Sequence, residues 1–381
     1  MRLLVFGGWY GSGNIGDDAI LIGLRNAFYE AAPDVELVAI STDPAYTSRV
    51  CGVESMRLRA PQSTLGGGLK EYFPAFRDVD GCLISGGTPF YDYGYLSRGF
   101  HVGLPIILDK KIFCFGVGAK PITSPLGVRF MRLLLSKTSL VSARDDPSRR
   151  ILRGFTTSNV ALTGDSALLM QPAREEAARR LLERAGVEVD EPAVAVCPRL
   201  LSTDYRSHYH DEVEAPTIDL IRESIAYAAD KLLQDGYQVV FLPMHVAAPD
   251  DDRAEIRDIL KRMSSRGARV IADWVHPREM MAALGLMRLV IGLRLHSLIF
   301  AASRGVPVAS IGYDAKIGGF MELVGAGGCL ADPTDRLDLY LKARRALDDS
   351  KAVGAVLLRS CGEIIGRIRA EARSVVDELE G

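Results

Sequence analysis

Five basic or titratable side chains follow short apolar runs in the second half of the sequence. Each run has the length and composition of a β-strand, and the side chains that come directly after these runs are Arg199, His245, Arg294, His296 and Lys316. Ligands of open α/β sheets bind beyond the carboxyl ends of the strands, so we expect these side chains to share one rim. A lone strand-end histidine or arginine is usually structural. Five such groups together suit a compact ligand with several negative charges and an acid/base group beside it.

A glycine-rich turn follows the first apolar run of the chain. Residues 7–17 read Gly-Gly-Trp-Tyr-Gly-Ser-Gly-Asn-Ile-Gly-Asp, without the Gly-Lys-Ser/Thr of a Walker loop. Glycines let a backbone approach a ligand closely, and the N-terminus of the helix that follows offers N–H groups. Gly11, Asn14 and Gly16 are therefore candidate ligand contacts. Asp17 is either a ligand contact or the cap of that helix.

A second glycine-rich turn follows residues 81–85. It contains Gly86 and Gly87 and continues to Tyr91 and Asp92. It is either a tight strand-to-helix turn or a cradle for a polyol, in which Asp92 accepts hydrogen bonds from hydroxyls and Tyr91 stacks on a sugar face.

Arg144 ends an apolar run at residues 140–143. A guanidinium that is nearly buried needs a partner. That partner is either one of the nearby aspartates, Asp145, Asp146 and Asp165, or a carboxylate or phosphate of a ligand, which the fork of arginine binds with two hydrogen bonds.

Strand-like and helical stretches alternate along the chain and must position these residues. Strands are predicted at 2–7, 35–40, 81–85, 112–117, 140–143, 160–163, 193–197, 238–242, 269–272, 289–291 and 308–311. Helices are predicted at 17–31, 95–104, 125–137, 147–153, 217–235, 251–264, 277–286 and 296–303. The near-continuous apolar character of the strands is typical of parallel sheets covered on both faces. The predicted fold is α/β, with two doubly wound Rossmann-like lobes.

The domain boundaries follow from the same pattern. We predict an N-terminal lobe at 1–170, a polar connector at 171–191, a C-terminal lobe at 192–334 and a wholly helical tail at 335–381 that packs back on the first lobe.

Composition narrows the class of protein. The 381 residues carry 46 Lys and Arg against 48 Asp and Glu, a net charge of −2, which argues against a nucleic-acid binder. The six cysteines form no C-x-x-C pair, and the two neighbouring histidines His208 and His210 lack enough partners, so no metal site is predicted. The absence of a signal peptide and of a long apolar stretch predicts a soluble, cytoplasmic protein.

Taken in order, these motifs resemble the polysaccharide pyruvyl transferase family, including the enzymes that pyruvylate bacterial cell-wall glycans. The resemblance covers most of the chain, and its most specific part is Arg294-Leu295-His296, then Gly305-Val306-Pro307, then Tyr313-Asp314-Ala315-Lys316. It also includes residues 13–17, 85–92, 142–145 and 164–165. Ser85 departs from the family pattern, which more often has a third glycine there, and this bears on the acceptor sugar.

The resemblance implies a GT-B-like fold, phosphoenolpyruvate as donor and a sugar diol as acceptor, with pyruvate held in the product as a cyclic ketal. It implies that Arg144, His296 and Lys316 contact the donor, with Arg294 beside them. We expect His296 to serve as acid/base, Arg199 to help bind the donor, and the acceptor to face residues 11–17 and 85–93. No cofactor is expected. A lipid-linked acceptor would place the protein at the inner face of the cytoplasmic membrane. The basic and apolar residues 129–135 either touch lipid there or, as their pattern favours, form a helix that faces the core.

Two alternatives share this scaffold. One is a GT-B glycosyltransferase that uses a nucleotide sugar, although Glu322 is the single nearby candidate for the usual acidic ribose ligand. The other is a non-catalytic sugar-binding protein. The acceptor sugar, the dependence on metal and the oligomeric state are not indicated by the sequence.

Overall fold

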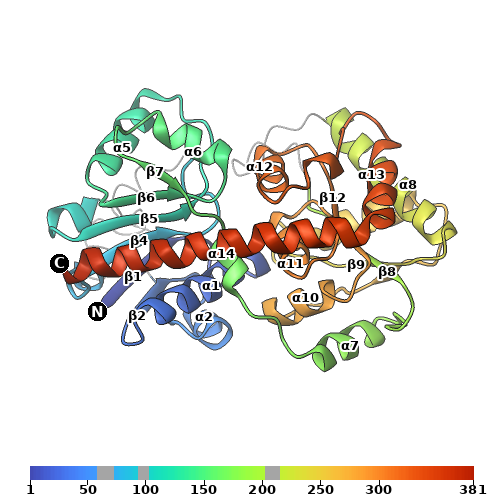
Figure 1. Ribbon diagram of the computed structural model, residues 1–381, viewed down its shortest axis with the longest axis horizontal. Coiled ribbons are helices and arrows are strands. Elements are labelled where there is room, and N and C mark those ends of the chain that lie inside the picture. The colour runs from blue at the N-terminus through green and yellow to red at the C-terminus, as the bar shows by residue number, and fades with distance from the viewer. Residues whose placement is uncertain (58–72, 93–102, 202–214) are drawn as a thin grey trace. The chain divides into compact units, whose positions relative to one another are not determined.

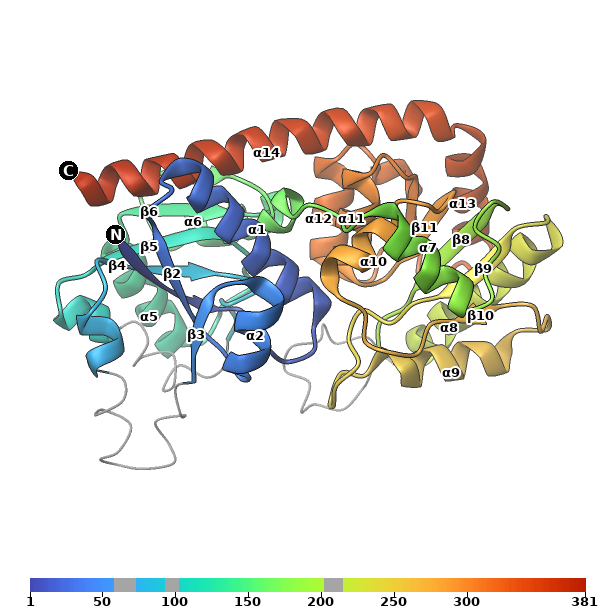
Figure 2. The same cartoon turned by 90° about the horizontal axis from the view of Figure 1, so that it is seen from below.

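The computed structural model describes residues 1–57, 73–92, 103–201 and 215–381. These residues form two compact units, which Figure 1 and Figure 2 show from two sides. Unit 1 comprises Met1–Ser12, Asp17–Met170 and Ile364–Gly381, and unit 2 comprises Gly13–Gly16 and Gln171–Glu363. Each unit has a parallel sheet with helices beside it, which confirms the predicted α/β class.

The sheet of unit 1 has seven strands in the order β3-β2-β1-β4-β5-β6-β7. β1 lies between β2 and β4, and its Val5 pairs with Ala39 on one side and Leu83 on the other. The winding therefore reverses between β1 and β4, which in open sheets is where ligands bind. The strands are β1 (Arg2–Gly7), β2 (Glu36–Ile40), β3 (Glu54–Met56), β4 (Gly81–Ser85), β5 (Lys111–Val117), β6 (Leu140–Ala143) and β7 (Val160–Leu162), and the helices are α1 (Ile15–Ala31), α2 (Pro44–Cys51), α5 (Pro125–Ser136), α6 (Asp146–Arg153) and the short 3-10 helix η2 (Ser166–Leu169).

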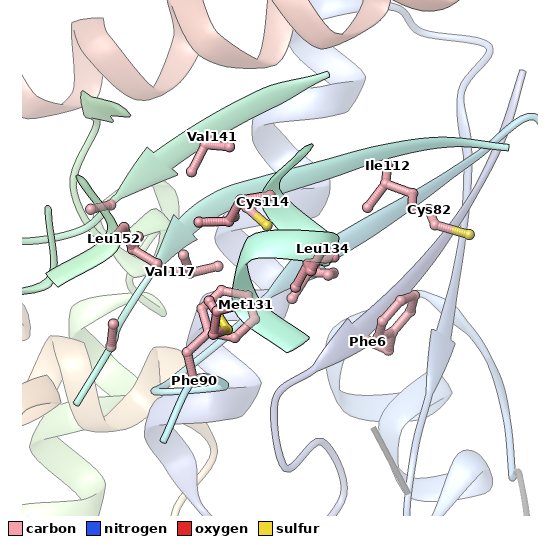
Figure 3. Packing of buried hydrophobic residues seen from close by; sticks show 14 of the residues in the cluster. Phe6, Cys82, Phe90, Ile112, Cys114, Val117, Met131, Leu134, Val141 and Leu152 are labelled. Carbon is pink, nitrogen blue, oxygen red and sulfur yellow. The ribbon is translucent and has the colours of Figure 1, made fainter. Parts of the chain in front are cut away.

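Alternation along β5 explains how this sheet packs against a helix on each face. Phe115 packs on Phe28 of α1, with ring centroids 5.6 Å apart. Its neighbour Cys114 belongs to a buried cluster that includes Met131 and Leu134 of α5 (Figure 3). Because successive side chains of a strand point to opposite faces, one apolar run serves both helices.

The outer face of α5 is apolar and basic. Leu126 and Leu133, two turns apart on the helix, are 60% and 54% exposed. Arg129 and Arg132 are exposed as well, and residues 125–136 include no acidic residue.

The chain ends in a long helix, α14 (Ser350–Glu380), whose last turns belong to unit 1 and lie along its sheet (Figure 2). Arg367 Nη1 donates a hydrogen bond to the Leu162 carbonyl at 3.3 Å. Ile364 covers Gly164, where an added Cβ would lie 2.2 Å from the isoleucine Cγ2. Gly164 has φ +111°, so both its conformation and the docked helix require glycine.

The sheet of unit 2 has six strands in the order β10-β9-β8-β11-β12-β13, so its winding reverses between β8 and β11. The strands are β8 (Ala193–Cys197), β9 (Gln238–Phe241), β10 (Arg269–Val270), β11 (Leu289–Gly292), β12 (Val308–Ile311) and β13 (Leu330–Ala331), and the helices are α7 (Glu175–Arg184), α8 (Ala215–Gln234), α9 (Asp252–Arg262), α10 (Pro277–Leu284), α11 (Leu295–Ser303), α12 (Ala315–Leu323), η3 (Gly327–Cys329) and α13 (Asp338–Asp348).

The domain boundaries differ from the predicted ones in three places. Residues 171–191 are not a separate connector, because α7 packs on α10 and the Ala173 N–H donates to the Arg278 carbonyl at 2.8 Å. The predicted tail is interrupted at Asp349, and α13 packs on α8 and β12 within unit 2. Gly13–Gly16, predicted in the first lobe, belongs to unit 2 because Ile15 N–H donates to the Met244 carbonyl at 3.1 Å.

Secondary structure agrees at the centre of each sheet and differs at the edges. The predictions at 2–7, 81–85, 140–143, 193–197 and 308–311 coincide with β1, β4, β6, β8 and β12. The short strands β3 and β13 and the helices α2 and α12 were not predicted. The helix predicted at 95–104 lies largely outside the described residues.

Candidate functional site

In unit 1 the two glycine-rich turns meet at the point where the winding reverses. The Tyr10 hydroxyl, at the end of β1, donates to the Ser85 carbonyl of β4 at 2.9 Å. An added Cβ on Gly86, which has φ +101°, would lie 2.7 Å from Gly8 Cα, and one on Gly87 would lie 3.1 Å from Asp17 Oδ1. The turns thus pack backbone on backbone, and four predicted residues, Gly11, Asp17, Gly86 and Gly87, belong to this one region of unit 1.

A buried acid anchors the first turn. The Tyr46 hydroxyl donates to Asp18 Oδ2 at 2.6 Å, and Gly11 N–H donates to Oδ1 at 3.4 Å. Burial raises the pKa of the Asp18 carboxyl to about 7, against these hydrogen bonds, which lower it. Asp18 cannot be preferred to Asp17 on sequence alone, because both belong to the first turn of α1.

The Asp92 carboxylate forms hydrogen bonds with groups of the protein itself. Its carboxylate accepts hydrogen bonds from Thr123 N–H at 3.0 Å, Ser124 N–H at 2.7 Å and the hydroxyls of both residues. Ser124 caps α5, so the arrangement favours a structural role for Asp92 over contact with a sugar. Tyr91 beside it is half-buried, and the neighbouring Tyr93 lies outside the described residues.

Arg144 is buried, and its partners in unit 1 include two of the three aspartates that the sequence suggested for a structural role. Its Nε lies 3.3 Å from Asp145 Oδ2, its Nη1 lies 3.7 Å from Asp165 Oδ2, and its Nη2 donates to Thr88 Oγ1 at 2.9 Å. An added Cβ on Gly118 would lie 2.9 Å from Nη2, so the guanidinium lies directly against the turn that ends β5. The group is therefore fixed at the strand ends by two carboxylates and a hydroxyl.

In unit 2 a trio of charges follows β8 and β12. Arg199 Nη1 and Lys316 Nζ both contact Asp314 Oδ2, at 3.1 and 2.6 Å. Burial alone would lower the pKa of Arg199, but the adjacent Tyr313 and Asp314 raise it above its usual value. Two cations share one carboxylate, so the trio has a formal surplus of one positive charge. The Lys316 side chain is 21% exposed, and this is the side of the trio that solvent reaches.

Arg294, which follows β11, is paired with a residue that the sequence analysis did not select. Its Nε and Nη2 donate to the carboxylate of Asp252 at 3.0 and 2.6 Å, and Nη2 also donates to the Asp250 carbonyl at 3.0 Å. Asp252 has no exposed surface. An aspartate at the start of a helix usually caps it, and nothing in the sequence indicates that Asp252 instead binds a distant arginine. The cap of α9 is the neighbouring Asp251.

The two candidate histidines of unit 2 lie against the segment Gly13–Gly16. Asn14 forms an antiparallel backbone bridge with His245, which is 2% exposed. Asn14 Oδ1 accepts a hydrogen bond from Gly16 N–H at 3.0 Å. An added Cβ on Gly16 would lie 2.0 Å from Nδ1 of His296, so the absence of a side chain there is what accommodates the imidazole. His296 itself is half-buried in the first turn of α11.

The two histidines that the sequence analysis considered as metal ligands, His208 and His210, lie outside the described residues. Within the described part of the chain, no group of three His, Cys, Asp or Glu side chains could hold a metal ion. No helix among the described residues is long and apolar enough to cross a membrane.

Comparison with known proteins adds the family and the fold. The family model for polysaccharide pyruvyl transferase matches residues 14–315. A glycosyltransferase from Rickettsia africae matches with a TM-score of 0.66 at 10% identity, over 99% of this chain and 98% of that one. The complex of S. aureus MnaA with UDP matches with a TM-score of 0.62 at 13% identity, over 94% and 90%. A UDP-GlcNAc 2-epimerase from Neisseria meningitidis matches with a TM-score of 0.56 at 12% identity, over 96% of this chain and 99% of that one. At these identities the likeness establishes the fold, which is GT-B-like as predicted.

Proposed function

Because this chain belongs to the polysaccharide pyruvyl transferase family, we propose that it moves the pyruvate unit of phosphoenolpyruvate onto a sugar diol. A proton adds to the methylene carbon of the donor, and one sugar hydroxyl then bonds to C2. The C2–O bond to phosphate breaks, and the second hydroxyl takes its place. The two hydroxyl protons replace the one used at the methylene and the one that leaves with phosphate, so the products are a cyclic pyruvate ketal and inorganic phosphate.

The observation that carries this proposal is the set of groups at the strand ends of unit 2. Phosphoenolpyruvate carries a carboxylate and a phosphate on three carbons, and such a ligand requires cations held close together. Arg199 and Lys316 meet on Asp314 at the end of β12, and Lys316 is the partly exposed member. We assign the binding of the donor anion in unit 2 to this pair.

His296 is the proposed proton donor to the methylene carbon. Histidine changes charge near neutral pH, which suits a group that gives up one proton and regains another in each turnover. Its neighbour His245 is buried, so His296 is the better placed of the two to meet a substrate.

In unit 1 the proposal assigns sugar contacts to Gly87, Gly86 and Asp17, which lie together where the winding of the sheet reverses. Asp17 Oδ1 faces the Gly87 backbone, so a hydroxyl held at that turn would have a carboxylate acceptor. Arg144 remains a proposed contact to the donor. Its conservative replacement Arg144→Lys keeps the charge but loses the fork, and should raise the KM for phosphoenolpyruvate.

The acceptor is proposed to be a glycan presented at a membrane, with α5 as the contact surface. Leu126 and Leu133 offer apolar area, and Arg129 and Arg132 offer positive charge to anionic headgroups. Helices of this composition bind anionic bilayers without crossing them.

The experiment that tests the reaction compares donors. Purified protein is incubated with a panel of sugar and lipid-linked acceptors and either phosphoenolpyruvate or nucleotide sugars, and phosphate or nucleotide release is measured. Acceptor-dependent phosphate release from phosphoenolpyruvate supports the proposal. Nucleotide release with no phosphate release would support the glycosyltransferase alternative, and no release with any donor would support a non-catalytic sugar-binding protein.

A further inference from the structure

One buried carboxylate joins the ends of neighbouring strands in unit 2. Asp252, the first residue of α9, has no exposed surface. Its Oδ1 accepts from Leu200 N–H at 3.0 Å, and its Oδ2 accepts from Met244 and His245 N–H at 3.1 and 2.9 Å. Leu200 comes just after β8, and Met244 and His245 come just after β9. A carboxylate with this many donors is a fixed charge around which the strand ends are arranged.

Arg294 brings a third strand end to the same carboxylate. Its Nε lies 3.0 Å from each oxygen of Asp252, and its Nη2 lies 2.6 Å from Oδ1. β8, β9 and β11 are neighbours in the sheet, and β8 and β11 flank the point where the winding reverses. Asp252 occupies the Nε–Nη2 edge of the guanidinium, one of the two edges that can bind a carboxylate with two hydrogen bonds. The second N–H of Nη2 donates to the Asp250 carbonyl at 3.0 Å, so the other edge is partly occupied by the protein as well.

The two candidate histidines, His296 and His245, depend on this pair for their backbone positions. The Arg294 carbonyl accepts hydrogen bonds from Ser297 N–H at 3.1 Å and Ser297 Oγ at 2.6 Å, which start α11 and place His296 in its first turn. His245 is held by its own N–H on Asp252, and Asp252 N–H returns a hydrogen bond to the His245 carbonyl at 2.9 Å.

We propose that Asp252 is a positioning residue that fixes His296 and His245 through its contacts with Arg294 and the strand ends. Arg294 then binds a carboxylate of the protein and not the donor anion. This departs from the role that the family resemblance implies for it. The effect on turnover rests on the proposed function. The placement of the two imidazoles does not.

The chain contains a matched control one turn further along α9. Glu255 is also fully buried, its two oxygens accept from Nε and Nη2 of Arg222 at 2.8 Å each, and Leu201 N–H approaches it at 3.5 Å. This second pair has the same chemistry, the same helix and a carboxylate with the same burial. The groups that bond to Glu255 belong to Arg222 and Leu201, which are neither histidines nor strand-end residues of β9 or β11. Loss of Glu255 therefore reports the cost of removing a buried carboxylate from its arginine, without a change at the histidines.

The first readout is steady-state kinetics of full-length Asp252→Asn and Glu255→Gln with phosphoenolpyruvate. Both variants should melt at lower temperature. Asp252→Asn should lose about 100-fold in kcat, the usual effect of displacing a catalytic group by about 1 Å, with the KM for phosphoenolpyruvate within about threefold. Glu255→Gln should keep kcat within about threefold. A rise in KM of about tenfold or more at unchanged kcat would make Arg294 a donor ligand, and equal kcat losses in the two variants would reduce Asp252 to a structural role. Either result overturns the proposal.

The second readout is independent of turnover. Ring resonances of the histidines, assigned with single His→Ala variants, should move for His296 and His245 in Asp252→Asn and stay in place in Glu255→Gln. Arg294→Lys, which keeps the charge and loses the bidentate contact, should move the same two signals if Asp252→Asn does not fold. Unmoved signals contradict the proposal. If the wild-type protein releases no phosphate from phosphoenolpyruvate, but the signals of His296 and His245 still move in Asp252→Asn, the proposed function is refuted and the positioning role remains intact.

Discussion

Replacing Gly16 by alanine should separate activity from stability. Gly16 lies in the first turn of α1, and an added Cβ would lie 2.0 Å from Nδ1, 2.5 Å from Cγ and 2.7 Å from Cε1 of His296. An ordinary contact begins at 3.4 Å, so the imidazole must move by about 1.4 Å or rotate away. Gly16 lies in helical backbone, where alanine is the better residue by roughly 1 kcal/mol.

The expected effect on the reaction follows from that displacement. A catalytic group misplaced by about 1 Å costs on the order of 100-fold in rate, or about 2.7 kcal/mol of transition-state stabilisation. Gly16→Ala should therefore lower kcat by about 100-fold. The KM for phosphoenolpyruvate should change little, because the Arg199–Asp314–Lys316 trio is untouched. The melting temperature should stay within a few degrees of the wild-type value.

The assay is phosphate release at several donor concentrations, with thermal unfolding measured on the same samples. Gly366→Ala is the matched control, since Gly366 lies inside α14 and an added Cβ there meets nothing within 4 Å. It should raise stability slightly and leave kcat unchanged. A Gly16→Ala variant that keeps more than a third of the wild-type kcat would refute the role assigned to His296 against this turn.

Three further outcomes are expected. Burial raises the pKa of Asp18 to about 7, so between about pH 4 and 7 the carboxyl keeps a proton in the folded state that it has lost in the unfolded state. The free energy of unfolding therefore falls as the pH rises through that window, by at most about 1.4 kcal/mol per pH unit. Urea titrations should show this slope flattened in Asp18→Asn, and an unchanged slope would contradict the assignment. Gly164→Ala should destabilise the protein by about 2–4 kcal/mol, because its Cβ would lie 2.2 Å from Ile364 at a φ of +111°, and an unfolding midpoint equal to that of the wild type would show that α14 does not dock there. Binding to vesicles with 30% phosphatidylglycerol should fall at least tenfold in Leu126→Ser/Leu133→Ser and be absent for neutral vesicles, whereas equal binding to both vesicle types would remove α5 as the contact.

The centre of each sheet could be predicted from the sequence because the signal there is strong. β4 and β8 are fully buried runs, and a parallel strand covered on both faces reads as a continuous apolar stretch. The edge strands β3 and β13 are short, and β3 contains polar residues, so no such run marks them.

The membership of Gly13–Gly16 in unit 2 could not be predicted from local pattern. The segment follows the first strand and includes the first two residues of α1, and both β1 and the rest of α1 belong to unit 1. What places it in unit 2 is the backbone hydrogen bond from Ile15 to Met244 and the bridge from Asn14 to His245, contacts that join residues over two hundred positions apart.

The sequence selects the candidate residues by type and position at strand ends, but it does not identify their partners. Arg294 and Lys316 were both selected as cations for a donor. The structure pairs Arg294 with the buried Asp252 and leaves Lys316 partly exposed on Asp314, so the two differ in what they can offer a ligand. Spacing in a sequence identifies which charges share a rim. Which of them are neutralised there depends on carboxylates that arrive from other elements.

The most direct test of the central claim follows the bridging oxygen of phosphoenolpyruvate. Donor labelled with ¹⁸O between C2 and phosphorus is incubated with protein and a glycan acceptor, and phosphate and product are analysed by mass spectrometry. Transfer of the pyruvate unit breaks the bond between C2 and the bridging oxygen, so the label should appear in the released phosphate in a one-to-one ratio with the ketal, and His296→Ala should abolish both. Label retained in pyruvate, or ketal formation that survives in His296→Ala, would contradict the account.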